Sequence, residues 1–473
     1  MAVEKFLASQ MAENLGFPPT EGQRELFDKL SEFVIAPSAD KWLMVIKGYA
    51  GTGKTSAISA FIKLLKEIKK KYILIAPTGR AAKVLSNYSG VKAKTIHKQI
   101  YRQKSLTDKQ AQFKLDINKH KDTFFIVDEA SLITIGTDYG SSIFGSGDLL
   151  EDLFTYVRSG VNNKLILMGD SAPLPPIGLE ESPALDFDYL SGYGDFESSV
   201  LPDVVRQTKE SGILYNATLL REQIEDGDLS DPLFKTKGFD DFRKINGGEL
   251  IEELTNAIDK FGIDDVVVLC RSNLRANKYN MGIRQSVLFM EEQLTKGDKL
   301  MVVKNCYQFL ENVEDLDFIA NGDVAKLEKI WGYEERYGLH FASAILSFPD
   351  YDNIELDVKV ILDTLESTSA SLDSEQQKAL FEGVYADYSH ITTKKKRMEA
   401  VREDKYFNAL QIKYATAITG HKSQGGQWKC VFVDNSLWKE DISLDDKKWL
   451  YTAITRGIER VYLVNFKEKY FKS

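Results

Sequence analysis

A glycine-rich segment near residue 50 holds the clearest chemical signal in the sequence. Gly48-Tyr-Ala-Gly-Thr-Gly-Lys54-Thr55 fits the pattern G-x-x-x-x-G-K-[ST], in which backbone N–H groups surround phosphates at the N-terminus of a helix. The Lys54 ammonium would reach the β- and γ-phosphates, and the Thr55 hydroxyl would bind Mg²⁺. The sequence therefore predicts a site for ATP and Mg²⁺, with contacts from Gly48, Ala50, Gly51, Thr52, Gly53, Lys54, Thr55 and Ser56.

Two adjacent acids supply the second part of this chemistry. Asp128 and Glu129 follow the apolar run Phe124–Val127, which is the form of a Walker B strand. Asp128 is predicted to hold Mg²⁺ through water, and Glu129 to orient or deprotonate the attacking water. A kinase acting on a small substrate does not need a second acid that activates water. The pair therefore favours hydrolysis of a nucleoside triphosphate.

Both motifs stand at the ends of apolar runs rich in β-branched residues, which are typical of buried parallel strands. Helical patterns separate the early runs, as over residues 56–71. Strands that alternate with helices predict right-handed βαβ units and an α/β fold. Similar runs after residue 260 predict a second α/β domain. The runs are Trp42–Lys47, Tyr72–Ala76, Thr123–Val127, Lys164–Met168, Val266–Cys270, Cys430–Val433 and Val461–Phe466.

Further motifs follow in a fixed order, and together they resemble those of superfamily 1 helicases. The matches span residues 17–457, and His421-Lys-Ser-Gln-Gly425 near the C-terminus is most similar to the RecD/Dda/Pif-like branch. Gln23 occupies the position that reads the adenine edge in this family. The matching segments are Phe17–Gln23, Ala76–Ala82, Thr95–His97, Val127–Ser131, Leu167–Asp170, Leu174–Pro176, Val204–Gln207, Leu269–Asn280, Asn321–Asp323, Thr419–Gly425 and Tyr451–Gly457.

The resemblance implies two RecA-like P-loop domains, each a parallel sheet flanked by helices. The first would comprise residues 1–205, with a small hairpin insert at about 98–122. The second would comprise residues 206–332 and 413–473. It would be interrupted at 333–412 by an SH3-like β insert with a helical extension, where the sequence shows short antiparallel strands and then helical patterns.

ATP would lie in the cleft between these two domains. The resemblance assigns Arg206 and Arg456 as arginine fingers that reach the γ-phosphate from the second domain. The expected catalytic residues are then Lys54, Glu129, Arg206 and Arg456. Further nucleotide contacts are expected from Gln23, Asp170, Gln424 and Gly425.

Motif III departs from the family pattern at Pro173, where a glutamine usually precedes Leu-Pro-Pro. Proline has neither a side-chain amide nor a backbone N–H. Either Gln424 takes over the sensing of the γ-phosphate, or the coupling between ATP and DNA is altered.

The implied activity is that of an ATP-dependent DNA helicase that moves 5′→3′ on single-stranded DNA. Its partners would be single-stranded DNA and junctions with duplex, and it would act as a monomer in the cytoplasm, in DNA repair or recombination. Phe113 is expected at the tip of a hairpin that splits the duplex. Other strand contacts are expected from Pro77, Thr78, Gly79, Thr95, His97, Asn273, His421 and Lys422.

The charge of the chain is unevenly distributed. The formal net charge is −9, with 61 Lys+Arg and 70 Asp+Glu, which by itself argues against a nucleic-acid partner. Residues 61–122, however, contain 16 Lys/Arg and 4 Asp/Glu, a balance of +12, so the rest of the chain carries −21. Because a polyanion meets a local surface, the basic stretch reverses the first inference.

Other composition features exclude whole classes of protein. The 3 cysteines are far apart and form no CxxC pair, so neither a disulfide framework nor a zinc site is expected. No apolar run approaches the roughly 18 residues of a membrane span.

Three alternative functions stay open at this point. Backbone contacts that ignore sequence also suit RNA or an RNA–DNA hybrid. A regulatory P-loop ATPase without nucleic acid would leave the basic stretch and the two arginines unexplained. A binding module with a relic P-loop is disfavoured by the intact Lys54, Thr55, Asp128 and Glu129.

Overall fold

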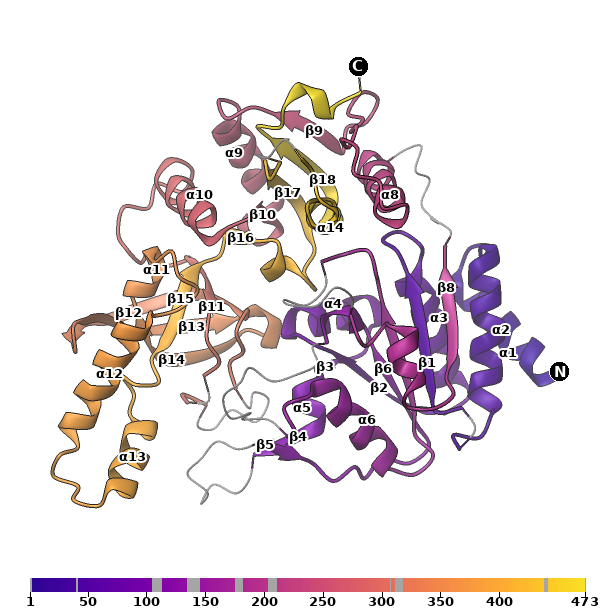
Figure 1. The fold of residues 1–473 in the computed structure, drawn as a ribbon, viewed down its shortest axis with the longest axis horizontal. Helices are drawn as coiled ribbons and strands as arrows, with labels where there is room; N and C mark the ends of the chain where they lie inside the picture. Colours follow the sequence, from indigo (N-terminus) through magenta and orange to yellow (C-terminus); the bar gives the residue numbers. More distant parts are fainter. Residues whose placement is uncertain are drawn as a thin grey trace.

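The computed structural model describes residues 2–39, 41–103, 113–133, 145–174, 182–202, 211–306, 308–310, 318–437 and 441–472. These residues form two α/β bodies and a small β-barrel (Figure 1). Of the predicted site residues, Arg206 lies outside the described ranges, as does the loop 104–112 of the predicted hairpin.

Six parallel strands build the first body, in the spatial order β3-β2-β6-β7-β1-β8. Successive strands are joined by crossovers, so the order in space differs from the order in the chain. The P-loop follows β1 and the two acids follow β6, which places both motifs at the carboxyl edge of the sheet. The strands are β1 (Leu43–Gly48), β2 (Lys71–Ala76), β3 (Lys94–Thr95), β6 (Thr123–Val127), β7 (Lys164–Gly169) and β8 (Glu197–Leu201).

Alternate residues of this sheet pack against helices on opposite faces, as the two-residue period of a strand requires. Met44 and Ile46 of β1 pack on one face, where the helices are α1 (Ala2–Leu15), α2 (Glu21–Ile35), α3 (Lys54–Glu67) and α4 (Gly79–Ser89). Leu43 and Val45 pack on the other, where they are α5 (Ile96–Ile100), α6 (Leu149–Ser159) and α7 (Phe187–Ser191). The sheet is therefore buried on both sides, which explains its nearly uniform apolar sequence.

The second body repeats this plan with five parallel strands in the order β16-β10-β17-β18-β9. These are β9 (Phe242–Ile245), β10 (Val266–Cys270), β16 (Ala417–Thr419), β17 (Trp428–Asp434) and β18 (Gly457–Val464). Helices α8 (Gly212–Glu225) and α14 (Leu444–Ile454) cover one face, and α9 (Leu250–Phe261) and α10 (Asn273–Ser286) cover the other.

A closed five-stranded barrel branches from the second body. Its strands are β11 (Lys299–Val302), β12 (Val324–Arg336), β13 (Leu339–Phe348), β14 (Ile354–Ile361) and β15 (Leu410–Tyr414), and the helices α11 (Asp363–Glu366), α12 (Ser374–Asp387) and α13 (Lys394–Glu403) follow β14. The barrel thus begins at residue 299, whereas the sequence places the insert at 333–412. Four residues of β11 form too short a run to be recognised, and their pairing partners in β12 and β15 are distant in the chain.

A two-stranded hairpin completes the fold. It joins β4 (Tyr101–Gln103) to β5 (Phe113–Leu115) and packs beside α5 and α6 on the first body. The predicted α/β class, with two RecA-like parallel sheets, a small hairpin insert and an SH3-like barrel, is confirmed.

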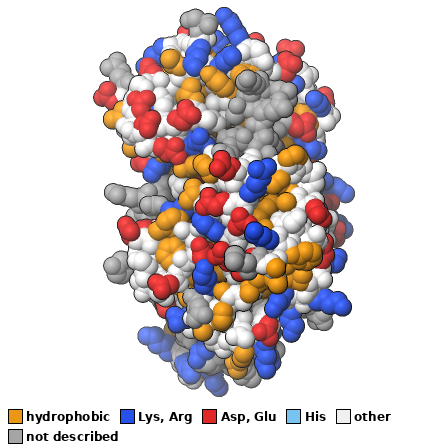
Figure 2. All heavy atoms as spheres, turned by 90° about the vertical axis from the view of Figure 1, so that its right-hand side faces the viewer, with side chains coloured by type: hydrophobic (Ala, Val, Ile, Leu, Met, Phe, Trp, Pro, Cys, Tyr) orange, Lys and Arg blue, Asp and Glu red, His pale blue; other side chains and the backbone are white. Residues whose placement is uncertain are grey.

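The helices, the surface charge and the cysteines have the following properties. No helix of the described residues is both long enough and apolar enough to cross a membrane. On the side of the molecule that lies at the right of Figure 1, acidic and basic side chains are interspersed (Figure 2). Cys270, Cys306 and Cys430 are free thiols, and all three are buried.

Candidate functional site

The P-loop lies between β1 and α3 with the backbone that its glycines allow. Gly51 and Gly53 have φ values of 82° and 80°, a left-handed region that other residues seldom adopt. A Cβ at Gly48 would lie 2.9 Å from Thr52 Oγ1 and 3.0 Å from Lys54 Cγ, so this position also requires glycine. The loop therefore wraps tightly around the N-terminus of α3.

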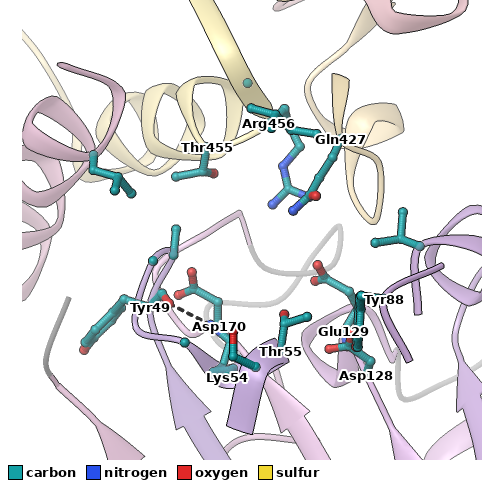
Figure 3. Close-up of a pocket in the computed structure, with 18 of the residues that line it drawn as sticks. Tyr49, Lys54, Thr55, Tyr88, Asp128, Glu129, Asp170, Gln427, Thr455 and Arg456 are labelled. Atoms are coloured by element: carbon teal, nitrogen blue, oxygen red, sulfur yellow. Dashed lines mark hydrogen bonds between the residues drawn. The ribbon is translucent and has the colours of Figure 1, made fainter. Parts of the chain in front are cut away.

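Lys54 is turned back onto its own loop. Its ammonium donates hydrogen bonds to the carbonyl oxygens of Gly48 and, at 2.8 Å, Tyr49 (Figure 3). These are the only protein acceptors recorded for Lys54 in the described chain, and both are neutral. An incoming phosphate would be a stronger acceptor because it is charged.

The two acids after β6 are adjacent in the chain and half-buried. Asp128 accepts hydrogen bonds from the Tyr88 hydroxyl and, at 2.8 Å, from the backbone N–H of Glu129. Glu129 has a φ of 53°, a left-handed conformation that is strained for a residue with a side chain. Burial raises the pKa of both carboxyls, and nearby Arg456 partly offsets this for Glu129.

The second body faces this loop across a cavity of about 590 Å³. Thr455, Arg456 and Gln427 come from the second body, and Lys54, Thr55, Asp128, Glu129 and Asp170 from the first (Figure 3). The Arg456 guanidinium points into the cavity and donates to the carbonyl oxygens of Thr452 and Gly426, at 3.2 Å each. One cavity thus brings most of the predicted catalytic residues together.

Tyr451 of α14 bridges the two bodies at the rim of the cavity. Its hydroxyl accepts a hydrogen bond from the Ala50 N–H at 2.9 Å and donates one to Asp170 at 2.7 Å. Motif III is joined to the second body nearby, where the Leu174 N–H donates to Thr452 Oγ1 at 3.0 Å.

Gln424 lies outside the nucleotide cavity, contrary to expectation. Its side-chain amide donates to the carbonyl oxygen of Leu174 at 2.7 Å, and it lines a second cavity instead. The turn at Gly425, with a φ of 73°, redirects the chain so that Gly425 and Gln427 face the nucleotide cavity. Gln427 was missed because it lies outside the matched segment Thr419–Gly425.

Gln23 supplies a test of whether the site suits an adenine nucleotide. It is fully buried, its Oε1 accepts the Thr20 N–H at 3.1 Å, and its Nε2 has no hydrogen-bond partner among the described residues. A buried amide without an acceptor is unfavourable unless a ligand provides one. Phe17, six residues earlier, lines the cavity, whereas Gln23 is fully buried and is not among the lining residues. Together with Thr55 and Asp128 as oxygen ligands for Mg²⁺, these residues fit ATP and Mg²⁺.

The second cavity, of about 520 Å³, contains most of the predicted strand-contacting residues. We call it the strand channel. It lies where the first body, the second body and the barrel meet, and it is lined by Pro77, Thr78, Gly79, Thr95, His97, His421 and Lys422, among others.

Two helix N-termini and three basic side chains line the strand channel. Thr78 and Thr95 cap α4 and α5 by accepting the N–H groups of Ala81 and Lys98, each at 3.2 Å. Burial lowers the pKa of His97 to about 4, so its imidazole is neutral at physiological pH. Burial also lowers the pKa of His421 and that of Lys422.

One wall of this channel is formed by the barrel, which contacts the start of α4. A Cβ at Gly79 would lie 2.5 Å from the hydroxyl oxygen of Tyr351, which belongs to the short helix η3 (Pro349–Tyr351) between β13 and β14. Tyr351 in turn donates to Asp323, at 2.9 Å from Oδ1 and 3.0 Å from Oδ2. Glycine at position 79 therefore lets the barrel approach the start of α4.

Two predicted strand contacts lie elsewhere. Phe113 is 4% exposed and packs in the core of the first body at the base of the hairpin, so its ring is not presented at a tip. The sequence did not predict this burial, because Phe113 stands next to a polar loop and no local pattern indicates that its side chain faces the core. Asn273 begins α10 and lines neither cavity.

Comparison with known proteins agrees with this geometry. A model of the AAA domain matches residues 20–229, which include the P-loop and the two acids. A model of the UvrD-like helicase C-terminal domain matches residues 414–464, which include His421 and Arg456. These two matches confirm the predicted resemblance to superfamily 1 helicases of the RecD/Pif-like branch.

The proteins that this chain resembles are distant in sequence. Uncharacterized protein R530 of Acanthamoeba polyphaga mimivirus is 22% identical over 92% of this chain and 97% of its own length. The ATP-dependent RecD2 DNA helicase of Deinococcus radiodurans is 28% identical over 37% of this chain, which corresponds to 24% of RecD2. A crystal structure of the Bacteroides Pif1 helicase with ADP-AlF3 and single-stranded DNA has a TM-score of 0.45 and 14% identity, covering 97% of this chain and 95% of that chain.

Proposed function

We propose that this protein is a superfamily 1 DNA helicase that hydrolyses ATP, moves 5′→3′ on a single strand and unwinds duplex ahead of it. One observation carries the proposal: the cavity that joins Lys54, Asp128 and Glu129 to Arg456 lies between two bodies that also enclose the strand channel. The direction of movement is inferred from the RecD/Pif1 branch, and DNA repair or recombination would be the setting.

The residues of the cleft have distinct parts in hydrolysis. On binding ATP, Lys54 would exchange its carbonyl partners for the β- and γ-phosphates, while Thr55 and Asp128 would hold Mg²⁺, whose charge neutralises the phosphates. Glu129 would orient the attacking water and accept its proton. Arg456 would turn from the Gly426 and Thr452 carbonyls to the γ-phosphate, a contact worth roughly 10³–10⁵ in rate for arginine fingers.

Helix α4 offers a mechanical link between the two cavities. It begins at Thr78 and Gly79 in the strand channel, and Tyr88 in its last turn donates to Asp128 in the cleft. Closure of the two bodies around ATP would therefore move groups that contact the strand, and release after hydrolysis would reverse the movement.

Matched DNA substrates test this proposal. ATP turnover should rise when single-stranded DNA is added, and unwinding should be faster for a duplex with a 5′ tail than for one with a 3′ tail. Lys54→Ala should abolish turnover, because the phosphates lose their principal cation, and should leave single-strand binding within about twofold of wild type. Turnover that DNA does not stimulate would contradict the helicase function. Stronger stimulation by RNA or by an RNA–DNA hybrid would move the assignment to those substrates.

A further inference from the structure

A third cavity lies on the first body, outside both the nucleotide cleft and the strand channel. Its volume is about 800 Å³, and it is bordered by β2, β3, α5, the base of the β4–β5 hairpin and α6. We call it the basic cavity because five cationic side chains line it: Lys92, Lys94, Lys98, Arg102 and Lys119.

The positive charge of the basic cavity is only partly neutralised. Asp116 is the acidic residue among the lining groups, and it pairs with Arg102 at 2.6 Å. Lys92 is 3.3 Å from Asp352 of the barrel. Lys94 and Lys119 are exposed and form no ion pair with any described residue. The cavity therefore concentrates charge of one sign within a concave surface, which strengthens its attraction for anions.

Two further side chains at the basic cavity, those of His120 and Ile117, indicate what kind of ligand it would bind. His120 lines the cavity, and its pKa is lowered first by burial and then by the charges of Lys94 and Lys71. The exposed side chain of Ile117, 77% accessible, lies at the same wall. A surface that combines cations with an exposed aliphatic group suits a polymer with charged and apolar parts better than a small inorganic anion.

The basic cavity and the strand channel lie on two sides of α5. Lys98 lines both of them, while Thr95 and His97 face the channel and Gln99 and Arg102 face the basic cavity. The hairpin continues directly from α5 at Tyr101. A nucleic acid whose two strands part at the hairpin would therefore meet polar and cationic groups on either side of it.

We propose that the basic cavity binds the phosphodiester backbone of the nucleic acid that is not held in the strand channel. This inference rests on the proposed function, because it presupposes a junction. The backbone has two possible sources, the displaced single strand or the unopened duplex arm, and both present regularly spaced phosphates to lysines.

The test replaces two lysines that have no other role in the described structure. Lys94→Glu with Lys119→Glu is compared with Lys260→Glu with Lys467→Glu, which makes the same change of charge at exposed positions of the second body. Binding is measured by fluorescence anisotropy with a single-stranded oligonucleotide, a 5′-tailed duplex and a fork that has both tails. Thermal melting of each variant verifies that it is folded.

The proposal predicts at least a tenfold loss of fork affinity for Lys94→Glu with Lys119→Glu. The slope of the logarithm of the fork binding constant against the logarithm of salt concentration should also become shallower by about 2. Affinity for the single strand should stay within twofold of wild type. An equal loss on the 5′-tailed duplex would assign the cavity to the duplex arm, and a loss confined to the fork would assign it to the displaced strand.

Two outcomes would overturn the proposal. Fork affinity within twofold of the control variant would show that the cavity binds no backbone, and an equal loss for the single strand would make it part of the strand channel. A different result would contradict the proposed helicase function: no stimulation of ATP turnover in the wild-type protein by single-stranded DNA.

Discussion

Tyr88 is the residue that links the end of α4 to the nucleotide site. Its hydroxyl donates to Asp128 Oδ2, and burial raises the pKa of Tyr88 far above its ordinary value, so the hydroxyl stays protonated. The bond occupies a carboxylate oxygen that a hydrated Mg²⁺ would also use. No motif points to Tyr88 in the sequence, because the contact joins α4 to the end of β6, between residues 40 positions apart.

Tyr88→Phe should lower the Mg²⁺ concentration that gives half-maximal ATP turnover. The change frees the Asp128 oxygen without leaving a cavity, and a hydrogen bond to a charged group is worth about 1.5 kcal/mol, which corresponds to about tenfold. A magnesium titration of ATPase and of fluorescent-nucleotide binding measures the effect. Tyr72→Phe on β2 is the matched control, and an unchanged magnesium requirement in both variants would show that Tyr88 does not act through Asp128.

At the scale of elements, the sequence predicts those parts whose signal is local. The buried strands β1, β2, β6, β7, β10, β17 and β18 lie where apolar runs predict them, within a few residues at each end. Strand β8 (Glu197–Leu201) escaped prediction because it is an edge strand with polar residues, and β11 because it is short.

The residues of the candidate site likewise fall into two groups, those that the local sequence predicts and those that it does not. Consecutive residues such as Gly48–Thr55 are recognisable because their chemistry requires fixed spacing. Backbone turns and packing between the two bodies determine three other features: the burial of Phe113, the hydrogen bond from Gln424 to Leu174, and the position of Gln427 at the nucleotide cavity. Such contacts leave no periodic trace in the chain.

The contact between the barrel and α4 contains a carboxyl whose ionisation opposes folding. Asp323 is 5% exposed, and burial raises its pKa to about 7 from an ordinary 3.8. Between these two values the folded protein keeps the proton and the unfolded chain has lost it. Stability is therefore lost as the pH rises through this window, and it is recovered as the pH falls.

Asp323→Asn should remove this pH dependence. Between pH 5 and pH 8, the unfolding free energy of the variant should increase relative to wild type by on the order of 2 kcal/mol, since each unit of pKa shift corresponds to about 1.4 kcal/mol. Denaturant melts at both pH values measure the difference. Glu355→Gln, at an exposed position on β14, is the control, and parallel pH profiles for Asp323→Asn and wild type would refute the prediction.

At the scale of the whole molecule, a few contacts hold the two bodies together across the cleft. Tyr451 joins the P-loop and Asp170, Gln424 joins Leu174, and the Arg80 guanidinium of α4 stacks on Trp428 of β17 at 4.0 Å. These three contacts are polar or charged, and the apolar side chains of Ala172 and Leu174 from the first body also pack against the core of the second body. Such a surface suits bodies that move relative to one another.

Tyr451→Phe should loosen the closed arrangement. The Ala50 N–H loses its acceptor, and hydrogen exchange of this amide in nucleotide-free protein should accelerate about tenfold, as expected for one net hydrogen bond. Mass spectrometry of peptides that contain the P-loop measures the rate. Tyr462→Phe breaks a bond to Glu253 within the second body and should leave this rate unchanged. Equal exchange in both variants would mean that Tyr451 does not hold the cleft.

The three buried thiols make such movements easy to observe. Burial raises the pKa of Cys306 to about 11 and that of Cys430 to about 12, and Cys270 is shifted in the same direction. Because only the thiolate reacts readily with maleimide-type reagents, the native cysteines should stay unmodified under mild labelling. A pair of dyes can then be attached to cysteines introduced on the two bodies of the otherwise natural chain, and opening and closing can be followed one molecule at a time.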